Sequence, residues 1–257
     1  MIPKIIHYCW FGPNNIPNEL INHMKSWELF CPDYEIKLWN EDSFDINSHP
    51  FTKSAYNEGK YAYVSDYVRA YALNVYGGIY LDTDVELKQN LDIFLNHEAF
   101  TGFECIGAPF TAVWGSIENH SLTKRILDYY KNKVYTIHEP TNTASVSEIL
   151  IKDYHINPLS NEKQKGDDNN NSIIVYPSTT FCLDLATNYA THHFHGSWLE
   201  NKKKSFKINI HEKYLLESLI KYNSIYKENN FIKEIAKNLT FKDFLKLLRY
   251  FIKYRVF

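Results

Sequence analysis

Short apolar runs alternate with polar breaks at the start of the chain. The run at residues 4–10 is rich in β-forming side chains and ends at Gly12-Pro13, which predicts a strand followed by a loop. Apolar residues then recur at helical spacing from Leu20 to Trp27, and they alternate with charged residues over 34–38. We therefore expect the chain to open β-loop-α-β, the beginning of an α/β sheet.

A helix, a strand and an acidic pair follow in close succession. Residues 62–75 have a helical pattern that Gly77-Gly78 ends. Residues 79–81 form a short buried strand, and Asp82 and Asp84 follow at its C-terminal end. Because ligands of open α/β sheets bind beyond the C-terminal ends of strands, the acidic pair lies where a site is expected.

The rest of the chain continues this pattern and then becomes helical. Strands are predicted at 99–104, 112–115 and 173–176, helices at 121–130 and 142–151, and an exposed loop at 160–172. From residue 211 the pattern is helical. We predict an α/β domain over residues 1–210 and a helical C-terminal extension over 211–257.

Composition and charge narrow the class of protein. The 28 basic and 30 acidic side chains nearly cancel, so no basic excess indicates nucleic acid. Tyr, Phe and Trp are abundant, and besides packing they offer faces on which sugars and bases stack. Cys9, Cys31, Cys105 and Cys182 are widely separated, which predicts reduced thiols in a cytoplasmic protein. With no signal peptide and no membrane-length apolar run, we expect a soluble protein at the cytoplasmic side.

The acidic pair indicates a metal site. Asp82 and Asp84 point to one face if the segment is extended, and two carboxylates on one face repel unless a cation joins them. Hard oxygen ligands suit Mg²⁺ or Mn²⁺, which can neutralise a departing diphosphate. The alternative is an exposed acidic turn. Asp66 and Arg69, three apart on the preceding helix, form either a surface ion pair or a pair that holds phosphate and sugar oxygens.

Together these residues resemble a known family. Ser65-Asp66-x-x-Arg69, Leu73 and Tyr76-Gly77-Gly78-Ile79-Tyr80-Leu81-Asp82-x-Asp84 are similar to the core motif of glycosyltransferase family 32. The family includes capsule and lipopolysaccharide enzymes, and the catalytic domains of clostridial glucosylating toxins are more distantly similar. Residues 2–12 resemble the family's N-terminal strand and nucleotide loop. The resemblance implies that residues 1–210 form a GT-A catalytic domain with a divalent metal, usually Mn²⁺, and that the reaction retains anomeric configuration.

The resemblance also implies roles for particular residues. Asp84 would ligate the metal directly, and Asp82 would contact the ribose or donor sugar and reach the metal through water. Asp66 and Arg69 would hold hydroxyl and phosphate groups of the donor. Trp10 and Phe11 would line a pocket for its base and ribose.

A histidine-rich segment completes the predicted site. His193 is the expected metal ligand, with Ser197 and Trp198 contacting the diphosphate, whereas His192 is expected to be a hydrogen-bonded core residue. The family usually has a small residue where this chain has His195. A zinc site built from His193 and His195 is a weaker alternative, because no cysteine lies nearby to complete it.

The predicted reaction moves a hexose from a UDP- or GDP-linked sugar to a hydroxyl of a glycan or lipid-linked glycan. A retaining enzyme either lets the leaving phosphate accept the acceptor proton or uses a carboxylate nucleophile, for which Glu104 and Glu118 are candidates. Residues 141–145 are expected to border the acceptor.

The pattern of the C-terminal segment indicates what surface the protein binds. Residues 241–255 combine an apolar stripe with Lys and Arg, a pattern typical of a helix on an anionic membrane. The alternative is a helix packed on the catalytic domain.

Two other functions fit parts of the sequence. A haloacid-dehalogenase-like phosphohydrolase also has Asp-x-Asp after a strand, with the first Asp as nucleophile. A carbohydrate-binding protein without turnover would keep the fold, although the intact acidic residues and Arg69 argue against it.

Overall fold

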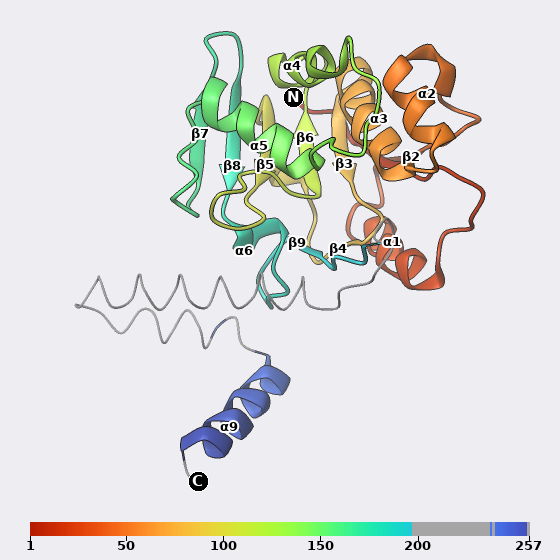
Figure 1. Cartoon of the computed structure of the whole chain (residues 1–257). Coiled ribbons are helices and arrows are strands. Elements are labelled where there is room, and N and C mark those ends of the chain that lie inside the picture. Colours follow the sequence, from red (N-terminus) through yellow and green to blue (C-terminus); the bar gives the residue numbers. More distant parts are fainter. Residues whose placement is uncertain (197–236, 238–239, 256–257) are drawn as a thin grey trace.

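A computed structural model describes residues 1–196, 237 and 240–255. Its centre is a seven-stranded mixed sheet of order β2-β1-β3-β6-β5-β8-β7, with helices on both faces (Figure 1). The sheet strands are β1 (Ile5–Cys9), β2 (Glu35–Trp39), β3 (Gly78–Leu81), β5 (Ala99–Gly102), β6 (Val113–Ser116), β7 (Gln164–Asp167) and β8 (Ser172–Tyr176). A separate two-stranded antiparallel sheet pairs β4 (Val85–Leu87) with β9 (Ala190–His192).

The helices are α1 (Asn18–Phe30), α2 (Pro50–Asn57), α3 (Tyr61–Tyr76), α4 (Ser121–Tyr130), α5 (Asn142–Asp153), the short α6 (Ser178–Phe181) and α9 (Phe241–Arg255), with 3-10 turns at Ile46–Ser48 and Asp92–Phe94. Helices α1, α3, α4 and α5 lie where the sequence predicts them, with ends shifted by up to three residues, whereas α2 and α6 were not predicted. The predicted boundary between residues 210 and 211 lies outside the described residues.

Strand direction decides which chain segments meet. β1 runs parallel to β2 and β3, while β6 is antiparallel to both β3 and β5, and β5 is parallel to β8. Five strands therefore point the same way, and the C-terminal ends of β1, β3, β5 and β8 share one edge of the sheet. The β4–β9 pair lies at that edge, below the main sheet in Figure 1. This mixed sheet with helices on both faces confirms the α/β fold class predicted from the sequence.

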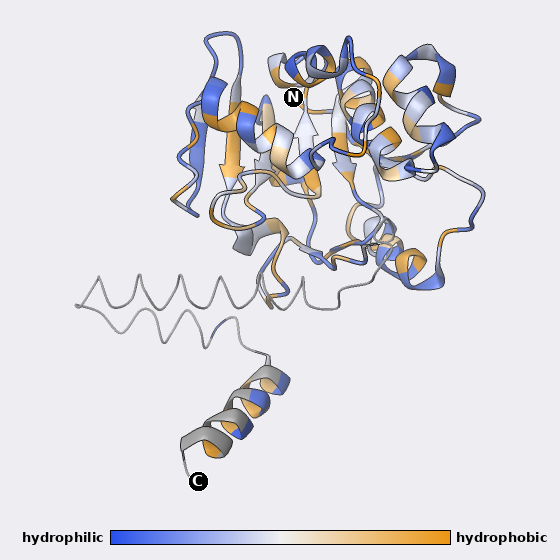
Figure 2. Cartoon of the chain, viewed as in Figure 1, coloured by the Kyte–Doolittle hydropathy of each residue, from blue (hydrophilic) through white to orange (hydrophobic). Residues whose placement is uncertain are grey.

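Alternation along the strands builds a core on each face. In β3, Tyr80 belongs to the apolar cluster under α2, α3, α4 and α5, whereas Ile79 and Leu81 belong to the opposite cluster with Trp27 of α1. In Figure 2 the apolar colour gathers on strands such as β8, while the β7 side of the molecule is polar. Burial on both faces makes β3 a rigid support for the residues that follow it.

The glycine pair before β3 is required by close packing. A Cβ on Gly77 would come within 2.9 Å of Pro3, and one on Gly78 within 2.7 Å of the Ile5 carbonyl oxygen. The buried His7 ring fills the remaining space: Trp39 Nε1 donates to its Nδ1, so its Nε2–H donates to the Gly77 carbonyl at 2.8 Å. Burial lowers the pKa of His7 to about 4, and the ring is neutral at physiological pH.

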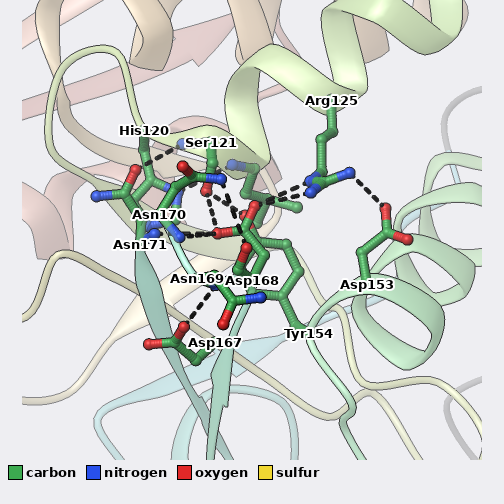
Figure 3. Close-up of polar contacts among 11 residues, drawn as sticks. His120, Ser121, Arg125, Asp153, Tyr154, Asp167, Asp168, Asn169, Asn170 and Asn171 are labelled. Atoms are coloured by element: carbon green, nitrogen blue, oxygen red, sulfur yellow. Dashed lines mark hydrogen bonds and ion pairs between the residues drawn. The ribbon is translucent and has the colours of Figure 1, made fainter.

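The predicted exposed loop over residues 160–172 is wrong in its middle, where a strand forms. Residues 164–167 form β7, which pairs with β8 through a tight turn. The polar side chains at this turn have a structural role, because the Asp168 carboxylate accepts hydrogen bonds from the backbone of the turn. Its Oδ1 accepts the backbone N–H groups of Asn170 and Asn171 at 3.1 and 3.0 Å (Figure 3). An Asn-rich composition therefore indicated a turn and not a mobile loop.

The same carboxylate ties the hairpin to α4. Ser121 donates to Asp168 Oδ1 at 3.0 Å, and Arg125 contacts Oδ2 through both Nε and Nη2 at 3.0 Å (Figure 3). Burial by itself would raise the pKa of Asp168, but the Asn171 N–H and the Arg125 side chain outweigh it and hold the pKa at about 2. The folded protein therefore strongly favours the ionised form.

Asp168→Asn should destabilise the protein in a pH-dependent way. Because the folded pKa lies below the unfolded value of about 3.9, the ionised carboxylate stabilises the fold above about pH 4, and that stability is lost as the pH falls towards 2. We expect the variant to lose roughly 1–2 kcal/mol in free energy of unfolding at pH 7 and much less at pH 2.5. Denaturant titrations at both pH values measure this. Asp128→Asn, an exposed carboxylate on α4, is the control, and an equal loss in the two variants at pH 7 would contradict the assignment.

Candidate functional site

The acidic pair lies in a tight turn and not in an extended segment. β3 ends at Leu81, the Asp82 N–H donates to the Ala112 carbonyl at 3.1 Å, and the Val85 N–H returns to the Asp82 carbonyl at 3.0 Å. The two carboxylates therefore converge because the chain turns between β3 and β4. The strand alternation assumed from the sequence is not what brings them together.

A buried arginine holds the first of these carboxylates. Arg69 Nη2 lies 3.1 Å from Asp82 Oδ1 and 3.1 Å from Asp66 Oδ1, and the Tyr80 hydroxyl also donates to Asp82 Oδ1 at 3.1 Å. The guanidinium carbon lies 4.4 Å from the Tyr80 ring centroid. The side chains of Arg69 and Asp66 are 10% and 11% exposed, which excludes the surface ion pair considered as an alternative. In this arrangement Arg69 positions Asp82.

The charges of this group are unequally distributed. Burial raises the pKa of Asp66 to about 7, although the nearby Arg69 charge opposes the shift. Burial would lower the pKa of Arg69, but Asp82, Tyr80 and Asp66 raise it, so the guanidinium stays charged. One cation thus faces two carboxyl groups, of which Asp66 readily takes up a proton near neutral pH.

The second carboxylate belongs with a histidine from a distant segment. Asp84 Oδ2 accepts the His195 N–H at 2.8 Å, and its Oδ1 lies 3.4 Å from His192 Nε2. Burial opposes both charges, but the two groups stabilise each other: the pKa of Asp84 is lowered to about 2, and that of His192 is raised. The Asp84 carboxylate is therefore ionised at neutral pH.

The structure places His192, and not the expected His193, beside Asp84. Ligand atoms of Asp82, Asp84 and His192 all lie within 4.8 Å of one another, whereas His193 points away and contacts Glu86. Successive residues at the end of β9 face opposite sides, and pairing of β9 with β4 decides which side faces Asp84. The two other residues expected here, Ser197 and Trp198, lie outside the described residues.

The residues present fit a divalent cation. Two carboxylates and one imidazole offer oxygen and nitrogen donors of the kind that Mn²⁺ and Mg²⁺ accept. All three side chains are positioned by packed elements, since Asp82 and Asp84 follow β3 and His192 ends β9. The zinc alternative from the sequence is not supported, because His195 Nε2 lies near Glu19 at 3.8 Å and not beside His193.

The aromatic pair after β1 lies at the same edge. Phe11 is buried in the core cluster with Cys9, so it supports the loop from beneath. Trp10 is only partly buried, and its Nε1 donates to the Asn14 carbonyl at 2.7 Å. Of the two residues expected to line a base pocket, Trp10 is the one that retains accessible surface.

Strand direction separates the two candidate nucleophiles. Glu104 follows β5, whose C-terminal end lies at the same edge as Asp82. Glu118 follows β6, which runs the opposite way, so it lies at the far edge near Gly77. The structure thereby excludes Glu118 from the site.

Glu104 is in electrostatic contact with the acidic site. Burial raises its pKa, opposed by the nearby His192 and by a hydrogen bond from Thr143 at the start of α5. The adjoining Asn142 side chain is buried, and neither its amide nitrogen nor its oxygen has a hydrogen-bond partner among the described residues. The first turn of α5 thus presents polar groups beside Glu104, although the sequence suggested this segment by its chain position alone.

Parts of the chain are similar to known proteins. Residues 17–101 match the family model described as "Glycosyltransferase sugar-binding region containing DXD motif". Inositol phosphoceramide mannosyltransferase 3 of Schizosaccharomyces pombe is 31% identical over 150 residues, covering 57% of this chain and 42% of that protein. An uncharacterised glycosyltransferase, L373, of Acanthamoeba polyphaga mimivirus is 28% identical, covering 84% of this chain and 91% of that protein. The solved PaToxG glycosyltransferase is 17% identical, with a TM-score of 0.46 over 59% of this chain and 68% of that chain.

The matched segment contains α3, β3 and the Asp82–Asp84 turn, and the chain spans less than half the length of the fission yeast relative. The carboxylates, the arginine and the glycine pair that the geometry singles out all lie inside it. This part of the chain is therefore similar to the glycosyltransferase sugar-binding region, as the sequence motif predicted.

Proposed function

We propose that this chain is a retaining, metal-dependent hexosyltransferase that moves a sugar from a nucleotide diphosphate to an acceptor hydroxyl. The observation that carries the proposal is the convergence of Asp82, Asp84 and His192 at the C-terminal edge of the sheet, beside the buried Arg69. Retention follows from the family resemblance.

The residues would divide the work as follows. Asp84 and His192 would hold a Mn²⁺ or Mg²⁺ ion, which supplies charge neutralisation for the departing diphosphate. Asp82 would bind the donor sugar or ribose, kept in one orientation by Arg69 and Tyr80. This division modifies the sequence-based expectation, since Arg69 acts through Asp82 and the histidine ligand is His192.

The acceptor side would be formed by Glu104 and the start of α5. The unpartnered amide of Asn142 can bind a sugar hydroxyl, and Glu104, held by Thr143, can orient one. Leaving the Asn142 amide buried without a partner is costly, and a bound hydroxyl would remove that cost.

Nucleotide-linked mannose should be tested first as the sugar donor. Several relatives are named mannosyltransferases, among them the Saccharomyces cerevisiae protein mannosyl phosphorylinositol ceramide synthase CSH1. We propose a glycan or lipid-linked glycan as acceptor, of the kind found in surface polysaccharides.

The C-terminal helix supports a membrane-associated acceptor. On α9, apolar Phe244, Leu245, Leu248 and Ile252 are 42–49% exposed and lie among exposed Lys and Arg side chains. A helix of this kind binds in the interface of an anionic bilayer. Among the described residues, no helix has the length and apolarity to cross a membrane. We therefore propose peripheral binding at the cytoplasmic leaflet.

Nucleotide release should depend on a divalent metal and on Asp84. Incubating the full chain with UDP-glucose, UDP-galactose, their N-acetyl forms and GDP-mannose should release UDP or GDP from one donor with Mn²⁺, and none with chelator. Asp84→Ala should lower this release by at least about 100-fold, because a direct ligand is lost. Metal-dependent release of phosphate from a monoester instead would support the haloacid-dehalogenase-like alternative. Donor binding without turnover would support a carbohydrate-binding protein.

The adjacent histidines provide a matched pair of variants. We expect His192→Ala to weaken Mn²⁺-dependent nucleotide binding on the order of 10–100-fold, because His192 faces Asp84. His193→Ala should leave it within about threefold, because His193 faces Glu86. Calorimetric titration of the nucleotide at saturating Mn²⁺ measures both. The reverse ranking would restore His193 as the ligand.

Binding to anionic vesicles should depend on the apolar side of α9. Phe244→Ser combined with Leu248→Ser should weaken binding to phosphatidylglycerol-containing vesicles at least about tenfold, because apolar area is removed from the bilayer interface. Ile137→Ser combined with Leu159→Ser removes two exposed apolar residues elsewhere and should have no effect. Flotation assays decide, and unchanged binding in the α9 variant would overturn the membrane proposal.

A further inference from the structure

A second group of metal-type ligands lies on the opposite side of β9 from Asp84. It consists of His23 from α1, Glu86 from β4 and His193, which follows β9, and its ligand atoms all lie within 4.8 Å of one another. His193 Nε2 lies 2.8 Å from Glu86 Oε2, and the His23 and His193 rings stack with centroids 3.9 Å apart. None of these side chains has a role in the proposed transfer reaction.

The backbone under this group is already held in place. Trp27 Nε1 donates to the Val85 carbonyl at 2.9 Å, and Ser26 Oγ accepts the Leu87 N–H at 2.8 Å, so α1 is tied to β4 on either side of Glu86. The His193 N–H donates to the Asp84 carbonyl at 2.9 Å. Three ligands from three elements therefore meet on a backbone that these hydrogen bonds hold in place.

We propose that His23, Glu86 and His193 bind a Zn²⁺ ion, separately from the Asp82–Asp84–His192 site. Two imidazoles and one carboxylate form a ligand set typical of zinc, with a fourth position left for water. Tetrahedral bonds of about 2.0–2.1 Å place neighbouring ligand atoms roughly 3.4 Å apart, and here the ligand atoms all lie within 4.8 Å of one another. The oxygen-rich site around Asp84 suits harder ions, so the two sites should differ in metal preference.

Partial exposure makes the group accessible to an ion from solution. The side chains of His193 and Glu86 are 19% and 39% exposed. A bound ion would fasten α1 to the end of β9, and because His192 is the preceding residue, it would also hold the segment that supplies the histidine near Asp84. Its role is structural bracing of that segment, in contrast to the donor-binding role proposed for the first site.

The test uses untagged full-length protein carrying Asp84→Ala, which disables the first site. In excess Mg²⁺, competition with a chromophoric zinc chelator should show one bound Zn²⁺ per chain, and adding His23→Ala should weaken that binding on the order of 100-fold. Adding His138→Ala, an exposed histidine elsewhere, should leave it unchanged. Co²⁺ in place of Zn²⁺ should show the stronger visible absorption of a four-coordinate ion, and His23→Ala should abolish it.

A near-isosteric variant covers the case in which His23→Ala disturbs folding. Glu86→Gln keeps the size and hydrogen bonding of the side chain and should still weaken Zn²⁺ binding by at least about tenfold, with an unchanged circular dichroism spectrum. Equal Zn²⁺ affinity with and without His23 and Glu86, or no bound Zn²⁺ at all, would overturn the proposal. Neither result affects the Mn²⁺-dependent transfer reaction, which is measured with Asp84 intact.

Discussion

The buried guanidinium of Arg69 is the interaction on which the site depends. Two carboxyl groups, Asp66 and Asp82, lie within 3.1 Å of the same nitrogen in a place from which water is largely excluded. Without that cation, each carboxylate would bear the cost of burial alone, and the pKa of Asp66 shows that burial already weighs heavily there. Stacking on Tyr80 keeps the guanidinium in one orientation. Asp82 therefore has a defined position before any ligand arrives, which is the condition for selective binding.

The second condition is the direction of the strands. Because five strands of the mixed sheet point the same way, the segments after β1, β3, β5 and β8 meet at one edge although they are far apart in the chain. The antiparallel β6 lies between β3 and β5 and keeps them parallel to each other. This places Glu104 near Asp82 and sends Glu118 to the far edge. The strand directions of the rigid sheet thus place only one of these two glutamates beside the site.

The short β4–β9 pair gives one strand two functions. Residues at the end of β9 alternate between its sides, so His192 meets Asp84 while His193 meets Glu86 and His23. Glu86 lies on the partner strand β4, whereas Asp84 precedes that strand in the turn after β3. Two charged groups with different donor atoms therefore lie on opposite sides of β9, and movement of one would be transmitted to the other through the shared backbone.

The sequence by itself determined the elements and the local motif. Helical spacing predicted α3, an apolar run of β-forming residues predicted β1, and alternation predicted β2. The glycine pair correctly marked the junction before β3, because these signals depend on neighbours within a few residues. The pairing of Asp66 with Arg69 also followed, since a helix places residues three apart on one face, but the contact of Arg69 with Asp82 did not.

Only the tertiary structure decided which histidine joins Asp84, because the register of β9 against β4 involves residues about a hundred positions apart. It also decided that Asp168 is buried under Arg125 and that Phe11 supports the core. Burial and strand direction are set by packing across the whole domain, and local periodicity carries no information about either.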